Sequence, residues 1–354
     1  MKVKLASIII FTLIIALSDS STAQNRIQNN KSPVIKFVKN EAKKKVDVLI
    51  DGKLFSSYWW PDTVYKPILY PLLSAAGTPV TRGFPIKARE GERRDHIHQV
   101  GNWLNYGNVN GIDFWGNGSE GKRNVKGGQI KHISIEKLSG GIGEGTMLTT
   151  AGWIAPDGNQ LIAERTELHF IAKGSTRIID RITTLTAGAL PVIMKDTKEG
   201  SFGIRVARQL ELPSKEVVTL TDANGQPTTL KKMSNEGVTG NYRSSEGVTG
   251  EAVWGKRAKW MDLYGNIGEE KISMVICDHP ENLTYPTYWH ARGYGLFAAN
   301  PFGVKDFTNG KEELNYTIPA GGSLTLKYRI VISSGSHLSD AEINAFADNF
   351  ASKY

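Results

Sequence analysis

Two stretches of the sequence gather residue types that could do chemistry. The first, Asp95–Trp103, holds His96 and His98 two positions apart and directly follows Arg94. If this stretch is a strand, the two-residue period places both imidazoles on one face. Imidazole titrates near neutral pH, so the pair predicts acid–base catalysis, with two nitrogen ligands for one metal ion as the alternative.

The second stretch, Asp278–Arg292, leaves one apolar strand pattern and leads into another. Loops at strand ends commonly carry function on β scaffolds. We expect His290 to be a catalytic partner of the first histidine pair, and His279 and Arg292 to bind substrate. For each of these side chains alone, a structural hydrogen-bonding role is the alternative.

A third candidate is the acidic loop 196–200, which precedes a predicted strand that carries Arg205. Glu199, beside a glycine, is the expected general base, and a solvated turn is the alternative reading. Arg94 and Arg205 are expected to bind a carboxylate, sulfate or hydroxyl group of the substrate. Asp95 is expected to bind sugar hydroxyls.

Tryptophan has a specific use beside such polar groups, because the apolar face of a sugar ring stacks on indole. Trp103 and Trp289 are the expected stacking residues, with burial in the core as the alternative for each. This mixture of residue types is suited to recognition of a polar ligand.

Composition excludes several classes of function. The formal charge of +8 is modest for 354 residues, and the lysines at 39 and 43–45 lie in a predicted turn. A solvated face, with a weak preference for acidic glycans, fits them better than a nucleic-acid partner. The single Cys277 lies in a buried-strand pattern and is expected to be a core residue. Walker, dinucleotide-binding, nucleophile-elbow and zinc-protease motifs are absent from the sequence.

The first residues predict export. Lys2 and Lys4 precede an apolar run over 5–17, and small residues at 21–23 suit signal peptidase. We expect a signal peptide over 1–23, a flexible segment over 24–33, and a secreted or periplasmic mature chain. No later run is apolar for long enough to insert into a membrane.

Strand patterns dominate the rest, and 34–354 is expected to be one domain. The only convincing helix is C-terminal, where Ser339 and Glu342 form a capping box ahead of Ile343, Phe346 and Phe350. The fold class is therefore expected to be all-β, a two-sheet sandwich with one C-terminal helix. The expected strands lie at 34–38, 46–50, 132–136, 147–154, 161–170, 176–185, 202–207, 217–220, 272–277, 294–298 and 324–333.

Three segments resemble the PmoA-like family. The first is Arg94-Asp95-His96-Ile97-His98 with the Asn-Gly-Ile-Asp-Phe-Trp run at 110–115. The second is the Asp-Thr-Lys-Glu-Gly run at 196–200 with Arg205. The third is the Trp-His-Ala-Arg run at 289–292 with Tyr-Gly at 294–295. The family's third histidine position is Gln99 here, and its proline is Ile97. The resemblance implies a protein of uncharacterised mechanism from a group common among secreted carbohydrate-processing proteins. By analogy, it also implies a supersandwich similar to galactose mutarotases.

The leading hypothesis is a secreted or periplasmic hydrolase, lyase or epimerase acting on an oligosaccharide. In it His96 or His98 is the acid or base, Glu199 or His290 is its partner, and no cofactor is needed. A metal-dependent oxidase or hydrolase, suggested by the methane oxygenase label of the family, would use His96 and His98 with His290 or His279. A non-catalytic glycan-binding module is the third hypothesis. No oligomeric state is predicted.

Overall fold

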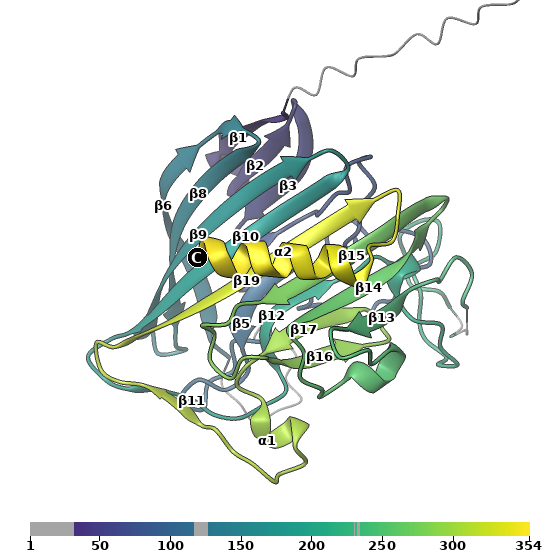
Figure 1. The fold of residues 1–354 in the computed structure, drawn as a ribbon. Helices are drawn as coiled ribbons and strands as arrows, with labels where there is room; N and C mark the ends of the chain where they lie inside the picture. The colour runs from purple at the N-terminus through teal and green to yellow at the C-terminus, as the bar shows by residue number, and fades with distance from the viewer. Residues whose placement is uncertain (1–31, 117–126, 230, 232–233) are drawn as a thin grey trace, which may run out of the picture. The chain divides into compact units, whose positions relative to one another are not determined.

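The computed structural model describes residues 32–116, 127–229, 231 and 234–354. The predicted signal peptide, 1–23, and all but the last two residues of the predicted flexible segment, 24–33, lie outside the described residues. The described chain folds into two large antiparallel sheets that face each other (Figure 1). The expected all-β, two-sheet sandwich with a C-terminal helix is confirmed.

The first sheet has nine strands. They are β1 (Val34–Asn40), β2 (Lys45–Ile50), β3 (Lys53–Trp59), β4 (Ile68–Leu69), β5 (Asn102–Tyr106), β7 (Gly141–Ile142), β12 (Gly200–Arg205), β16 (Tyr288–Arg292) and β17 (Leu296–Asn300). Their spatial order is β16-β17-β12-β5-β4-β3-β2-β1-β7. In this order β12 pairs with β5, so two segments far apart in the sequence become neighbours within the sheet.

The second sheet has eight strands. They are β6 (Gln129–Ser139), β8 (Glu144–Ile154), β9 (Gln160–Lys173), β10 (Thr176–Ala187), β13 (Asn241–Ser244), β14 (Trp260–Ile267), β15 (Glu270–Asp278) and β19 (Ser323–Ser334). Their order is β13-β14-β15-β19-β10-β9-β8-β6. A small third sheet pairs β11 (Val192–Met194) with β18 (Tyr316–Ile318).

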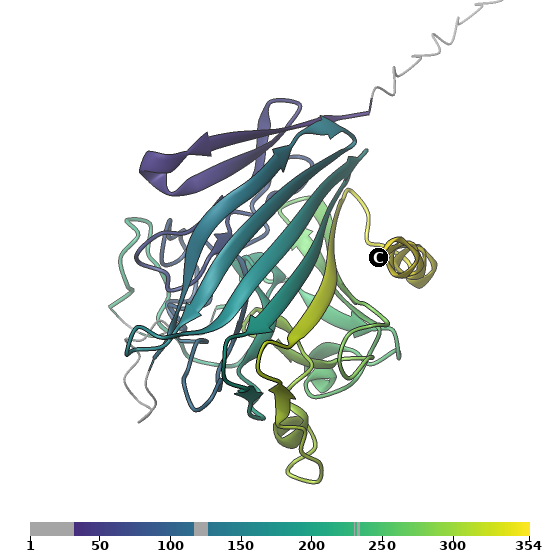
Figure 2. The ribbon, with the colours of Figure 1, turned by 90° about the vertical axis from the view of Figure 1, so that its left-hand side faces the viewer.

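Alternation of apolar and polar residues gives each strand one core face. In β9 the buried and less buried positions alternate over most of its length. The core forms where the two inner faces meet: Phe202 of β12 stacks on Tyr328 of β19 with ring centroids 4.7 Å apart, and Phe55 of β3 meets Phe170 of β9 edge-on at 6.3 Å. Figure 2 shows the two sheets on either side of this core.

The C-terminal helix α2 (Asp340–Lys353) covers the outer face of the eight-stranded sheet (Figures 1 and 2). Its predicted capping box is confirmed, because the Ser339 hydroxyl accepts from the Glu342 backbone N–H and the Glu342 carboxylate accepts from the Ser339 N–H. Ile343 and Phe350 are buried against the sheet. A single helical turn, α1 (Val304–Phe307), and three 3₁₀ turns, η1 (Glu41–Lys43), η2 (Arg208–Leu210) and η3 (Gly250–Val253), complete the fold. No helix within the described residues is long and apolar enough to cross a bilayer.

All but one of the predicted strands are present, and their ends are correct to within a few residues. Residues 217–220 form no named strand and hold only isolated bridge positions, one of which pairs Leu220 with Arg93. The sequence patterns also missed β5, β14 and β16, whose residues are buried on both faces and therefore do not alternate.

Candidate functional site

The outer face of the nine-stranded sheet carries most of the predicted site residues. His290 of β16 lies opposite Ala298 of β17, Ala298 lies opposite Gly203 of β12, and Gly203 lies opposite Trp103 of β5. These four residues form one row across four strands. Their neighbours along the strands, such as Trp289 and Phe202, point into the core instead.

A glycine in this row makes room for a tryptophan. A Cβ atom on Gly203 would lie 2.7 Å from the Trp103 indole, so any larger residue would displace that ring. Trp103 in turn meets Trp115 nearly edge-on, with ring centroids 5.5 Å apart. Together with Val100 and Leu296, these residues form an apolar cluster distinct from the main core. This cluster is the floor on which the histidines lie.

The segment 95–99 crosses this floor as a turn, and the expectation that His96 and His98 share a strand is wrong. His96 has a φ of 43°, in the left-handed region that non-glycine residues rarely occupy. Its carbonyl oxygen accepts hydrogen bonds from the Gln99 N–H at 3.0 Å and from the Arg82 guanidinium at 2.8 Å. The imidazoles of His96 and His98 nevertheless come close, with centroids 5.8 Å apart and planes at 76°. The two imidazoles are therefore close because the chain turns between them, and not because a strand places them on one face.

Two buried arginines hold Asp95. One carboxylate oxygen, Oδ1, accepts from Arg82 at 2.8 Å and from Arg205 at 2.7 Å, and both arginine side chains are almost fully buried. Arg205 also donates to the Gln99 side chain at 2.6 Å. Burial would raise the pKa of Asp95, but Arg205, the hydrogen bond with His96 and Arg82 together hold it well below its usual range. Asp95 is therefore a fixed carboxylate that is ionised at neutral pH.

The other Asp95 oxygen holds His96. Oδ2 lies 3.0 Å from His96 Nδ1, and the imidazole stacks on the Tyr294 ring at 4.8 Å with only 3° between the planes. The Arg205 guanidinium lies over the same tyrosine ring at 4.8 Å. The His96 side chain is 39% exposed, which makes it the histidine of this cluster that solvent reaches most easily. Its ring is thus fixed in plane and in rotation while remaining accessible.

His98 and His290 lie deeper. His98 is 5% exposed and meets Trp115 at 6.0 Å, while its backbone oxygen accepts from the Lys66 ammonium at 2.8 Å. His290 is 3% exposed and stacks on the same Trp115 at 6.5 Å. Burial lowers the pKa of His290 to about 4, although nearby Glu199 acts in the opposite direction. His290 is therefore a neutral imidazole at neutral pH.

Glu199 lies on the loop that leads into β12. Its carboxylate pairs with the Lys198 ammonium at 2.8 Å and is 13% exposed. The Glu199 backbone oxygen accepts from the Gly107 N–H at 2.7 Å, and a Cβ on that glycine would lie 2.7 Å from the Glu199 side chain. Glu199 lies close enough to His290 for its charge to act on that imidazole. Its predicted role as the partner of His96 or His98 stays a prediction.

Several other predicted site residues lie elsewhere. His279 is buried under α2, where its ring meets Phe350 at 5.2 Å, so it does not join the cluster. Trp289 is fully buried and its indole donates to the Ala258 carbonyl at 3.0 Å. Trp103 is also fully buried. Neither indole has a free face for a sugar ring, so the stacking role predicted for these two tryptophans does not fit the structure.

The remaining two predicted arginines lie at the edge of the cluster. Arg94 stacks on Phe84 at 4.6 Å and donates to the Gly225 carbonyl at 2.9 Å. Arg292 is exposed and lies over the Trp254 ring at 5.5 Å. Arg205, by contrast, acts on Asp95 and is too buried to bind substrate directly. Its predicted substrate-binding role therefore becomes a positioning role.

Sequence reasoning overlooked three residues of the cluster. Arg82 is fully buried and anchors Asp95, and nothing in its local pattern indicates this. Gln99 and Tyr294 were noted only as parts of longer motifs, although they bind Arg205 and His96. Their proximity to the predicted histidines within those motifs was the available signal.

The metal hypothesis needs three ligands that converge. Within the described residues no group of three or more histidine, cysteine, aspartate or glutamate side chains is arranged to hold a metal ion. His96 and His98 present their rings almost at right angles, and His279 lies under α2. The residues present therefore do not fit the ligand set that the sequence suggested.

The fold and this cluster define the class of protein: an antiparallel β-sandwich with a histidine, carboxylate and arginine cluster on the outer face of its nine-stranded sheet. The chain belongs to the family of unknown function DUF6807, whose profile matches residues 45–348. No curated protein matches the sequence. The resemblance to the PmoA-like family stays a prediction.

Solved structures show weak similarity in fold. The galactosidase domain of an α-galactosidase–sucrose kinase is 8% identical with a TM-score of 0.35, and the GH36 α-galactosidase AgaB from Geobacillus stearothermophilus is 13% identical with a TM-score of 0.34. Each match covers 84% of this chain and 41% of the other, so this chain spans less than half of either galactosidase chain. A galactose mutarotase related enzyme from Lactobacillus acidophilus is 9% identical with a TM-score of 0.29, covering 85% of this chain and 98% of that one.

Proposed function

We propose that the protein is a carbohydrate-active enzyme in which His96 transfers a proton to or from the substrate. The observation that carries the proposal is the way His96 is held. Its backbone occupies a strained conformation, Asp95 fixes Nδ1, and Tyr294 fixes the ring plane. Strain that the surrounding structure maintains is concentrated at functional sites in proteins.

The Asp95–His96 pair sets the chemistry of the imidazole. A carboxylate that is ionised at neutral pH accepts a hydrogen bond from Nδ1–H, so the neutral ring carries its lone pair on Nε2. Nε2 can then take a proton, and the carboxylate stabilises the imidazolium that forms. Arg82 and Arg205 keep Asp95 from rotating or becoming protonated. His96 thus has the orientation and the charge environment of a general base that can later act as the acid.

His290 has a different role in this proposal. His290 remains neutral at neutral pH and, at 3% exposure, is buried against Trp115, so it supports the cluster from below and does not contact substrate. Exposed Arg292 over Trp254 and half-exposed Lys198 add a cation and aromatic surface near the same strands. Polar groups on an aromatic surface suit a hydroxylated ligand such as an oligosaccharide.

We also propose that the mature chain is secreted or periplasmic. The support is the charged, apolar and small-residue order of residues 1–23. Mass spectrometry of protein recovered from culture medium or periplasm should find an N-terminus near Gln24. A chain that retains Met1 in the cytoplasm would contradict the proposal.

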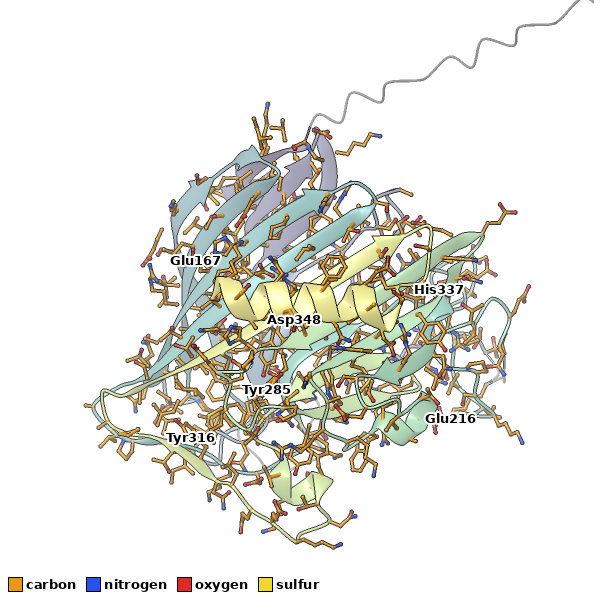
Figure 3. The ribbon with its side chains drawn as sticks, viewed as in Figure 1. Glu167, Glu216, Tyr285, Tyr316, His337 and Asp348 are labelled. Carbon is orange, nitrogen blue, oxygen red and sulfur yellow. The ribbon has the colours of Figure 1, made fainter. Side chains whose placement is uncertain are left out.

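The experiment for the catalytic proposal is a screen of oligosaccharides, with products followed by NMR, on the wild type and on His96→Gln. General acid–base catalysis contributes about 10²–10⁴-fold, so His96→Gln should lose at least about 100-fold in turnover. His337→Gln is the matched control, since His337 is exposed in the turn between β19 and α2 (Figure 3). Saturable sugar binding without turnover in any variant would favour a glycan-binding module instead.

A further inference from the structure

A second polar site lies away from the His96 ring. It is a hollow of about 430 Å³ lined by Lys44, which directly follows η1, by residues between Trp60 and Lys66, and by β6 at the edge of the eight-stranded sheet. Ligand pockets commonly measure about 300–1,000 Å³. An adjoining hollow of about 450 Å³ shares Asp62, Gln129 and Lys131 with it. Each of the two volumes falls within that range.

The lining of the first hollow is positively charged. Among the described residues of the lining, three lysines, Lys44, Lys66 and Lys131, accompany one carboxylate, Asp62, which leaves an excess of two positive charges (three minus one). Asp62 is paired with the Lys44 ammonium at 2.5 Å. Lys66 is buried and directs its ammonium at the His98 carbonyl, so it adds to the field without reaching a ligand. Lys131 is exposed and is the cation that a ligand in the hollow would meet.

Two charged groups that act on His132, one in β1 and one in η1, cancel each other. Lys39 and Glu41, whose charges act on His132 in opposite directions, form an ion pair with each other. Burial lowers the pKa of His132 to about 4, so this imidazole adds no charge at neutral pH. The positive excess therefore comes from lysines whose charge persists over the physiological range.

The hollow also has a rigid aromatic wall. The Trp60 indole stacks on the His132 ring with centroids 4.0 Å apart and 31° between the planes. The Tyr58 hydroxyl lies 3.1 Å from His132 Nδ1, which fixes that ring in turn. Trp60 is only partly buried, so part of the indole borders the hollow. Aromatic surface beside a cation is the arrangement that suits a sugar ring with an acidic substituent.

We propose that this hollow binds an acidic saccharide, with a sugar ring against Trp60 and its carboxylate or sulfate group near Lys131 and Lys44. The site gives a use to Lys44 and Lys131, which the His96 cluster does not involve. It does not depend on catalysis at His96, because none of its lining residues transfers the proton in the proposed reaction.

Isothermal titration with three probes of similar length tests the proposal: hexagalacturonate, a heparin-derived hexasaccharide and neutral maltohexaose. The protein should carry His96→Gln so that no probe is turned over. At least one acidic probe should bind at least about fivefold more tightly than maltohexaose, and its affinity should fall as salt rises. Which acidic probe binds more tightly decides between carboxylate and sulfate.

Charge variants locate the binding. Lys131→Glu should weaken acidic-probe binding about fivefold or more, whereas Lys137→Glu, an equally exposed change further along β6, should alter it less than about twofold. Asp62→Asn should tighten binding, because it removes the one carboxylate among the described residues of the lining. Equal weakening by the two lysine variants, or no preference for acidic probes, would overturn the proposal.

The two proposals fail separately. If the acidic probes bind as described and His96→Gln retains the wild-type rate on every substrate, the catalytic proposal is wrong and this site stands. If turnover depends on His96 but Lys131→Glu leaves binding of every acidic probe unchanged, this site is wrong and the catalytic proposal stands.

Discussion

Asp95→Asn is the change that separates the anchoring of His96 from its chemistry. Asparagine keeps the shape and one acceptor oxygen but removes the negative charge shared by Arg82 and Arg205, whose side chains are 1% and 0% exposed. Breaking a buried ion pair commonly costs 3–5 kcal/mol, because a buried charge is left uncompensated. Asp95 itself is 32% exposed, so screening by solvent reduces the expected loss to about 2 kcal/mol.

The loss should depend on pH with a defined sign. The folded pKa of Asp95 lies well below its unfolded value of about 3.9, so its stabilisation is complete above that value and is lost as the pH falls below it. Urea unfolding of the wild type and Asp95→Asn should therefore differ by about 2 kcal/mol at pH 7 and converge toward pH 2. The comparison requires that the wild type and the variant both unfold reversibly in urea.

Asp62→Asn provides the control for this measurement. Asp62 is also paired with a cation, Lys44, but its side chain is 83% exposed, so its loss should cost less than about 0.5 kcal/mol. If Asp95→Asn were no more destabilising than Asp62→Asn at pH 7, the anchoring role of the two buried arginines would be refuted.

Three further predictions concern single buried residues. The pKa of His290 is lowered to about 4, so its contribution to stability is present above about pH 6.5 and lost toward pH 4; His290→Gln should flatten the unfolding free energy over that range by up to about 3 kcal/mol. Burial raises the pKa of the Cys277 thiol to about 12, so Ellman's reagent should label the protein only after unfolding, and rapid labelling of native protein would contradict this burial. Gly203→Ala should force Trp103 out of place, change the near-ultraviolet circular dichroism and reduce turnover; an unchanged spectrum would show that the floor of the cluster adapts.

The sandwich could be predicted because apolar and polar residues alternate along most strands. The C-terminal helix could be predicted from its capping box. Strands β5 and β16, which the sequence patterns missed, behave differently, since both of their faces are covered and most of their polar residues are buried. Alternation carries no information in such strands. The expectation that His96 and His98 share a strand was wrong for a related reason: a positive φ at His96 depends on distant Arg82.

The site was predicted in composition but not in arrangement. His96, His98, Glu199 and His290 were selected for their types and come to the same region because β16, β17, β12 and β5 are neighbours. That strand order brings together segments nearly 200 positions apart, and it cannot be predicted from a single sequence. Burial was equally hidden, so tryptophans at 103 and 289 and the arginine at 205 were given contact roles that their surroundings do not allow.

The most direct test of the central claim is chemical rescue of His96→Ala by free imidazole. The His96 side chain is 39% exposed, so a small base from solvent can enter the space that the substitution leaves beside Asp95 and Tyr294. If His96 transfers the proton, turnover of the substrate found by screening should rise with imidazole concentration and follow the fraction of neutral imidazole or imidazolium. A variant that keeps the wild-type rate without imidazole, or an inactive but folded variant that imidazole never restores, would contradict the assignment of His96 as the proton-transfer residue.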